Sequence, residues 1–461
     1  MSEVKAYANP LGHEPIARLI LRYALPSVAS MLVTSLYNIV DQLYIARGVG
    51  FLGNAATTVT FPLVTVSLAL ALLIGIGSAA LLSLELGRGN RDCGGKIIGN
   101  VFILAALSGI AIMAITLIFQ EPILRALGAT DAIMPHAKDY SFYIATGFPF
   151  VVMGAGVSNI IRADGSPRYS MLSMVSGAIL NIILDPIFIF TLGMGTRGAA
   201  LATAISQAVS CLVAWYYIFF KARFVRLSLR DIRLELSLIP RQLGLGSASC
   251  INQFSMTVVN VVLNNTLRVY GAGTDLGADI PIAAMGIVMK INAIFISVIL
   301  GVVIGAQPIL GYNYGAQNFE RVKKTFRMDM AITFTVSLLA SILFVTAPQF
   351  FVSFFRDENP AFNEFAAKAM RIFLCCVFAA GVTIPSANYF QAVGKPAKSM
   401  VLNMTRQLIF LVPSIVILPA FIGLDGVLWA MPVTDLLALG VTAYFIIREM
   451  KSLGVRPAID Q

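Results

Sequence analysis

Residues 169–192 read YSMLSMVSGAILNIILDPIFIFTL, with Asp185 as the only charged side chain. About 20 mainly apolar residues suffice to cross the hydrocarbon core of a bilayer as a helix. The whole chain shares this character, since 58% of its 461 residues are hydrophobic, 12% are charged, and the mean hydropathy is +0.83. Soluble domains carry about 25% charged residues. The composition therefore excludes a soluble enzyme, a nucleic-acid-binding domain and a disordered chain, and it predicts an all-α polytopic membrane protein.

Twelve such segments follow one another along the chain, which predicts twelve transmembrane helices. The first segment is longer than the roughly 30 Å core requires, and Pro26 within it is the expected kink and hinge. The twelve segments cover residues 16–46, 55–85, 97–119, 140–161, 169–192, 198–220, 242–267, 280–311, 328–350, 366–391, 399–422 and 426–447.

The distribution of basic residues predicts the orientation of these helices. With the amino terminus inside, the inner loops and tails hold 23 of the 33 Lys and Arg residues, and the outer loops hold eight. Cytoplasmic loops carry the excess of basic residues in membrane proteins. We therefore expect a multi-pass protein of the inner (plasma) membrane with both termini in the cytoplasm.

The second half of the chain repeats features of the first at a nearly constant offset. Gly195 and Gly198 recur as Gly423 and Gly426, 228 residues later, and the loop motif at 163–167 recurs at 392–396. Because each repeat has six segments, the two halves share one orientation and should be related by a pseudo-two-fold axis along the membrane normal. We predict an N-lobe at 1–225, a cytoplasmic linker at 226–240 and a C-lobe at 241–461, which is a transporter architecture with alternating access.

Polar side chains from three segments of the first half reach one depth in the membrane. By helix rise, Asp41 lies about 9 Å, Asp185 about 10 Å and Thr203 about 8 Å below the outer surface. Asn181 precedes Asp185 by one helical turn and shares its face. Buried carboxylates need a proton, a cation or a basic partner, so these four residues are the predicted cation-coupling site. The alternative is a structural hydrogen-bond network that joins three helices.

The second half carries amides where the first carries acids. We assign substrate binding to Gln253, Met256 and Asn260 of the seventh segment, together with Tyr37 and Asn159 of the first lobe. The amides have an alternative role as hydrogen-bonding contacts between helices.

Two basic residues lie well inside predicted spans of the second half. Lys290 and Arg406 are each candidates for an internal ion pair with Asp435 or for direct contact with substrate.

Several motifs together resemble the MATE (multidrug and toxic compound extrusion) family, and its bacterial MepA- and DinF-like branch in particular. The resemblance covers nearly the whole chain. It implies two six-helix lobes in a V shape and export driven by inward H⁺ or Na⁺, with Asp41, Asn181, Asp185 and Thr203 in a cation-linked network and Pro26 at a bend of helix 1. The motifs that carry it are Pro26, 38–41, 162–167, 181–186, 307–316 and 406–410.

We therefore expect a secondary active antiporter that exports amphiphilic, often cationic, small molecules, with lipids around it and as a monomer. No cofactor, no nucleic-acid partner and no metal beyond Na⁺ at the coupling site is expected. The alternatives are a lipid-linked oligosaccharide flippase, which would require basic cleft residues for pyrophosphate, and an integral-membrane enzyme, for which the sequence offers no catalytic motif.

Overall fold

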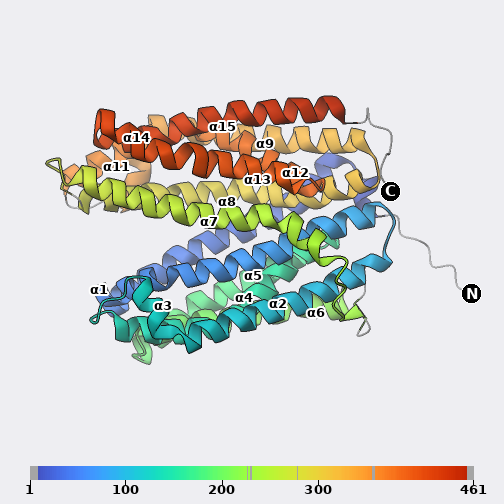
Figure 1. Cartoon of the computed structure of the whole chain (residues 1–461), viewed down its shortest axis with the longest axis horizontal. Helices are drawn as coiled ribbons and strands as arrows, with labels where there is room; N and C mark the ends of the chain where they lie inside the picture. Colours follow the sequence, from blue (N-terminus) through green and yellow to red (C-terminus); the bar gives the residue numbers. More distant parts are fainter. Residues whose placement is uncertain (1–8, 226, 229–230, 278, 356–358, 454–461) are drawn as a thin grey trace, which may run out of the picture.

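The computed structural model describes residues 9–225, 227–228, 231–277, 279–355 and 359–453, and this part of the chain forms helices joined by short turns. The elements up to residue 220 form the first lobe, drawn in blue to green in Figure 1. They are η1 (Pro10–Gly12), α1 (Ile16–Gly87), α2 (Asp92–Ile118), α3 (Gln120–Ala126), α4 (Met134–Ala163), α5 (Pro167–Pro186), the π-helix η2 (Ile187–Thr191) and α6 (Thr196–Phe220).

The elements from residue 239 onward form the second lobe, which lies beside the first and is drawn in yellow to red (Figure 1). They are α7 (Ile239–Gly271), α8 (Asp279–Gly315), α9 (Phe319–Thr346), α10 (Pro348–Val352), η4 (Ser353–Phe355), α11 (Pro360–Phe373), η5 (Val377–Ala379), α12 (Ala380–Ala392), α13 (Pro396–Met404), the π-helix η6 (Thr405–Leu411), α14 (Val412–Ile422) and α15 (Leu424–Ser452).

The twelve predicted segments are all helical, but they do not look alike. Within the described residues, ten helices are long and apolar enough to cross a membrane, and α11 with α12 forms an eleventh span that bends by 44°. The twelfth, α7, has the length of a span at 33 residues but is not among the apolar ones. Its lower hydropathy reflects amides such as Gln253 and Asn260, which we assigned to substrate binding.

The internal repeat is visible in the backbone. Gly195 has φ 56° and ψ −130°, and its counterpart Gly423 has φ 63° and ψ −146°. Gly165 and Gly394 likewise have φ of 86° and 82°. Within each pair, the two glycines lie just before equivalent helices of the two lobes. Residues other than glycine rarely adopt a positive φ. The two halves therefore share turn geometry as well as sequence, as the constant offset predicted.

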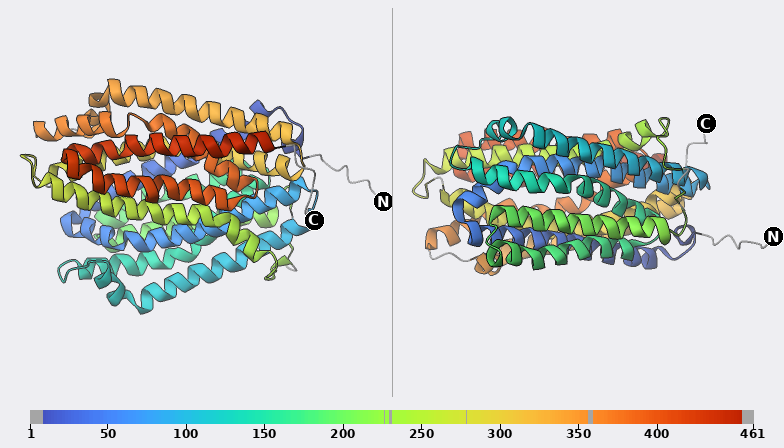
Figure 2. Two further views of the ribbon diagram at one scale, coloured as in Figure 1. Left: turned by 45° about the horizontal axis from the view of Figure 1, so that its top comes forward. Right: turned by 90° about the horizontal axis from the view of Figure 1, so that it is seen from below.

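The two ends of the helical bundle differ in what they contain. The start of α1 and the end of α15 lie at one end in Figures 1 and 2, which we call the proximal end, and the opposite end is the distal end. At the distal end α1 turns at Gly50, its only residue with non-helical backbone angles (φ 72°, ψ −154°). The loop predicted at 47–54 is thus a one-residue break, because glycine permits a positive φ.

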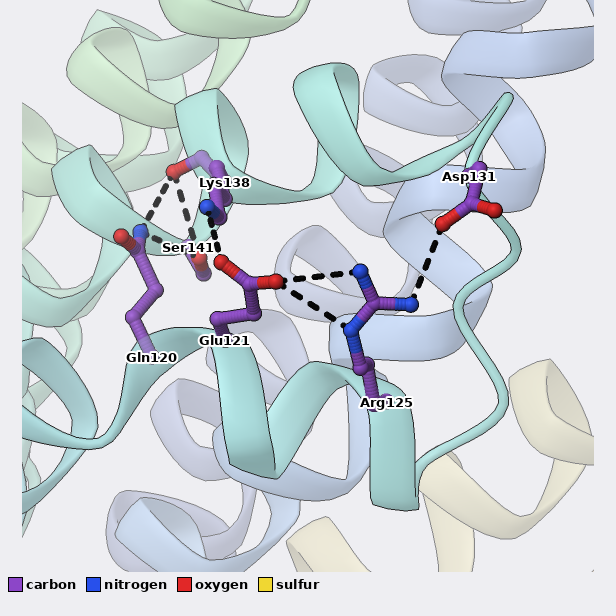
Figure 3. A network of polar contacts seen from close by, with 6 residues as sticks. All are labelled: Gln120, Glu121, Arg125, Asp131, Lys138 and Ser141. Carbon is purple, nitrogen blue, oxygen red and sulfur yellow. Dashed lines mark hydrogen bonds and ion pairs between the residues drawn. The ribbon is translucent and has the colours of Figure 1, made fainter.

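A network of polar and charged groups joins α3 to α4 and to the loop between them (Figure 3). Lys138 of α4 donates to Glu121 of α3 at 2.6 Å, and Arg125 joins Glu121 to Asp131 at 3.0 and 3.1 Å. The hydrogen bonds from Lys138 and Arg125 hold the pKa of Glu121 below its usual value. These exposed pairs orient α3 across the lobe and contribute little free energy.

The connection between the lobes is fixed to the first lobe. It runs from residue 221 to 238, whereas we predicted a linker at 226–240, of which residues 226 and 229–230 lie outside the described part. The buried carboxylate of Asp164 accepts hydrogen bonds from the backbone N–H groups of Arg223, Phe224 and Val225 at 2.7, 2.9 and 3.1 Å. This explains the acid in the loop motif at 163–167. The second copy of the motif has Val393 at this position.

The lobes meet closely in their proximal halves. A Cβ on Gly246 of α7 would lie 1.7 Å from the carbonyl oxygen of Leu73, and one on Gly305 of α8 would lie 2.7 Å from the Cα of Ala24. Arg241 of α7 also pairs with Glu85 of α1 across the lobes at 3.2 Å. Glycine therefore permits backbone contact between the lobes here, and this conformation is closed at the proximal end.

Replacing Gly246 by alanine is expected to open this proximal contact, because the methyl group cannot fit against the Leu73 carbonyl. Spin labels at the exposed, proximal residues Arg91 and Lys451 report the separation of the lobes. We expect Gly246→Ala to add a population with a distance longer by several ångströms. Gly244→Ala is the matched control, since nothing lies within 4 Å of its Cβ position. Identical distance distributions for the two variants would contradict this packing role.

The expected kink at Pro26 is not present as a break in this conformation. Helix α1 continues through Pro26 with helical backbone angles. The hinge role of Pro26 concerns movement between conformations, so it stays a prediction.

Candidate functional site

A small cavity inside the first lobe brings together polar residues of α1, α5 and α6. On α5, the Asn181 amide donates to the Oδ1 of Asp185 at 3.1 Å and to the hydroxyl of Thr203 on α6 at 3.3 Å. Asp185 is fully buried and Asn181 nearly so. Three of the four predicted coupling residues are thus joined by hydrogen bonds.

Asp41 of α1 completes this group. Its carboxyl is close enough to that of Asp185 for the two groups to interact electrostatically. Two carboxyl groups this close cannot both be ionised without a large cost unless a cation lies between them. Asp41 Oδ1, Asn181 Oδ1 and Asp185 Oδ2 are buried and have no hydrogen-bond partner among the described residues. These three acceptors lack a donor, so the site suits a proton or a hard monovalent cation such as Na⁺.

The local sequence explains why Asp185 lies at a weak point of its helix. Pro186 follows it directly and lacks the N–H that would bond to the preceding turn. The chain then continues as the π-helix η2, and single π-helical turns occur frequently at functional sites.

Two tyrosines, Tyr37 and Tyr140, lie close to the two acids. Tyr37 lines the cavity with Asn181 and Thr203, although we predicted that it contacts substrate. Tyr140 of α4, which the sequence analysis missed, is buried and interacts electrostatically with Asp41 and Asp185. A tyrosine in a predicted span gives no separate sequence signal, because aromatic residues are common there.

The predicted substrate residue Asn159 lies apart from the others. It accepts a hydrogen bond from Arg162 at 2.6 Å and donates to the carbonyl of Ala155 at 2.9 Å, near the proximal end of α4. It is nearly buried. The structure therefore places Asn159 within the first lobe and not beside the substrate residues of α7.

The three remaining predicted substrate residues lie on α7. Gly246 of this helix contacts the first lobe, and Gln253 and Asn260 follow it by 7 and 14 residues, which returns them to the same face. Met256 is beside them and is 45% exposed. Because Gly246 contacts Leu73, this face of α7 is turned toward the first lobe.

The second lobe contains one confirmed ion pair and one acid that the sequence analysis missed. Arg406 donates from Nε and Nη2 to Asp435 at 3.0 and 2.9 Å, which confirms an internal pair for Asp435. Asp329 of α9 is fully buried, and neither of its carboxyl oxygens has a partner in the described residues. Asp329 is the second residue of the span that we predicted at 328–350, which placed it at the edge of the membrane. Because α9 begins at Phe319, Asp329 lies inside the helix instead.

Comparison with known proteins agrees with this architecture. The MatE family model matches residues 26–187 and 248–416, once in each lobe. The FAD transporter of Shewanella oneidensis is 24% identical over 440 residues, covering 95% of each chain. The multidrug export protein MepA of Staphylococcus aureus is 25% identical over 428 residues, covering 91% of each. A solved structure, the outward-facing conformation of a multidrug resistance MATE family transporter of the MOP superfamily, superposes with a TM-score of 0.90 at 25% identity, covering 96% of this chain and 98% of that one. The chain therefore belongs to the MatE family, and it is a membrane transporter and not an enzyme.

Proposed function

We propose that this protein exports amphiphilic small molecules in exchange for H⁺ or Na⁺ by alternating access. The observation that carries the proposal is the position of α1. Its proximal part contacts the second lobe, where Val28 meets Gly301 and the hydroxyls of Ser35 and Ser297 share a hydrogen bond. Its distal part carries Asp41 of the candidate cation site. One helix thus connects the cation site to the interface between the lobes.

This arrangement provides the energetic link that an antiporter needs. A ligand shifts a conformational equilibrium only by its difference in affinity for the two states. A cation bound between Asp41 and Asp185 removes the repulsion of the carboxyl groups and so changes how α1 packs in the first lobe. Substrate would bind in a cleft between the two lobes, on the distal side of their contacts. There it would touch the opposite side of the same helix. Coupling between the two sites is then reciprocal.

The orientation follows from the basic loops. We propose that the proximal end is cytoplasmic and that the protein lies in the inner membrane as a monomer with both termini inside. Because the lobes are in contact at the proximal end, the conformation described here is then outward-facing.

Two substrate classes are suggested by the named relatives, and the cleft bears on the choice. MepA is named as a multidrug exporter and the Shewanella protein as an FAD transporter. We predicted amphiphilic, often cationic substrates because carboxylates and aromatic faces in the cleft would both favour cations. Asp41 and Asp185 lie in the candidate cation site, so the carboxylates do not add to that argument, whereas the apolar, aromatic and amide groups still support aromatic amphiphiles.

The test is efflux from proteoliposomes with H⁺ and Na⁺ gradients imposed separately. We expect dye export with one gradient and only background export without either. Export of no dye, together with translocation of a lipid-linked sugar, would favour the flippase alternative. An absence of any gradient dependence would contradict antiport.

A further inference from the structure

Lys290 of α8 is an exposed lysine at membrane depth, eleven residues after the first residue of its helix. Its predicted acidic partner, Asp435, pairs with Arg406 instead. No ion pair to Lys290 is found in the described part of the chain. A charged group facing lipid costs at least about 3 kcal/mol, so an exposed and unpaired ammonium must face water.

Helical geometry places Lys290 on the side of α8 that faces α1. Ser297 and Gly301 of α8 contact α1 directly, at Ser35 and Val28. Lys290 precedes Ser297 by seven residues, which is nearly two full turns, so it points in the same direction about 10 Å further toward the distal end. At that depth its face of α8 is exposed, because Gly286 and Ala293 are exposed as well. Lys290 therefore lies on the side of α8 that faces α1, just distal to the contacts between the lobes, where the proposed cleft would open.

The other groups on the walls of the cleft are uncharged at this depth. On α7 they are amides such as Gln253 and Asn260. Asn38 of α1 is exposed, three residues after Ser35. Asp41 is six residues after Ser35, which rotates it by about 240° and turns it away from α8 into the first lobe. Among the described residues at mid-membrane depth on α1, α7 and α8, Lys290 is the charged side chain that faces the cleft.

We propose that Lys290 binds the anionic group of the exported compound and selects amphiphilic aromatic molecules that carry a carboxylate or a phosphate. An exposed ammonium group without an acidic partner attracts such groups and repels cations. The α7 amides hydrogen-bond the neutral polar parts of the molecule, and the apolar walls contact its rings. This inference rests on the proposed export function and names the substrate class of the same cleft.

The experiment compares ligands that share a ring system but differ in charge, with purified full-length protein in lipid nanodiscs. Carboxyfluorescein and rhodamine 123 share a xanthene ring and test the carboxylate, while riboflavin phosphate and riboflavin test the phosphate. We expect the anionic member of at least one pair to bind more tightly. Lys290→Gln should weaken its binding on the order of tenfold and leave the uncharged or cationic member unchanged, which is the typical loss of one hydrogen bond to a charged group.

Three further variants separate charge from structure. Lys290→Arg keeps the charge and should retain the preference, and Lys290→Glu should reverse it toward rhodamine 123. Lys368→Gln is the matched control, because Lys368 pairs with Asp425 on the exposed surface of the second lobe. It should change neither affinity.

The outcomes distinguish this inference from the export function. The inference would be contradicted if Lys290→Gln weakened the binding of both members of a pair equally, or if the wild type bound the cationic member more tightly. Either result could occur while proteoliposomes still exported dyes, so it would leave the export function standing. If the wild type exported no dye under any gradient, the export function would fail, and the assignment of a substrate group to Lys290 would fail with it.

Discussion

Replacing Asp41 or Asp185 by asparagine is expected to reduce gradient-driven efflux to the background of empty proteoliposomes. Asparagine keeps the size of the side chain and can still form hydrogen bonds. Its neutral amide does not take up a proton near neutral pH, and it lacks the negative charge that attracts Na⁺. The protein should still fold, because the Asn181 amide can bond to an amide oxygen at position 185 as it does to the carboxylate. Binding of substrate in the cleft should persist, since Asp41 points from α1 into the first lobe, toward Asp185, and away from α8.

The measurement is dye efflux under imposed H⁺ and Na⁺ gradients, beside equilibrium binding of the same dye. Asp139→Asn is the matched control, because Asp139 is an acid of the same lobe that pairs with Arg197 at the distal surface at 2.8 Å. It should leave efflux unchanged. Asn260→Ala, in contrast, should change substrate affinity more than ion dependence. Wild-type efflux and unchanged ion dependence in the Asp41→Asn, Asp185→Asn double variant would refute the coupling role.

The sequence predicted depth better than it predicted direction. Counting helix rise from the loops placed Asp41, Asp185 and Thr203 at one level, and the structure joins Asp185 and Thr203 through Asn181. Depth depends only on the rise per residue, which is constant in a helix. Direction depends on which neighbour each face meets, and a single sequence does not contain that information. Tyr37 and Asn159 therefore contact other residues of the first lobe and not the predicted substrate residues of α7.

The helix boundaries failed for a different reason. The span that contains Asp329 begins nine residues earlier than predicted, because α9 extends beyond the apolar segment and its charged first turns lie at the proximal end. Hydropathy detects where a helix must be apolar and not where it begins. The same limit applies to α7, whose amides lower its hydropathy although it has the length of a span.

Loss of the Asp435 carboxylate is expected to have the largest effect on stability. Asp435 is 1% exposed and receives two hydrogen bonds from Arg406, whose side chain is also mostly buried. Arg406 lies in the π-helix η6, where the wider turn lets the guanidinium reach α15. Removing one partner leaves an uncompensated charge inside the lobe, which typically costs about 3–5 kcal/mol. We therefore expect Asp435→Ala to lower the free energy of unfolding by that amount.

The control and the double variant decide whether this loss comes from the stranded charge. Unfolding by a denaturing detergent in mixed micelles measures the free energy for each variant. Asp425 lies on α15, as Asp435 does, and forms an exposed ion pair with Lys368 of α11. Asp425→Ala should therefore lower the free energy of unfolding by less than about 1 kcal/mol. Arg406→Met combined with Asp435→Leu should recover most of the loss, since apolar residues of similar volume often replace a buried pair without cost. If the double variant were as unstable as Asp435→Ala, the pair would stabilise the lobe through its own attraction, and the interpretation that a stranded guanidinium causes the loss would be wrong.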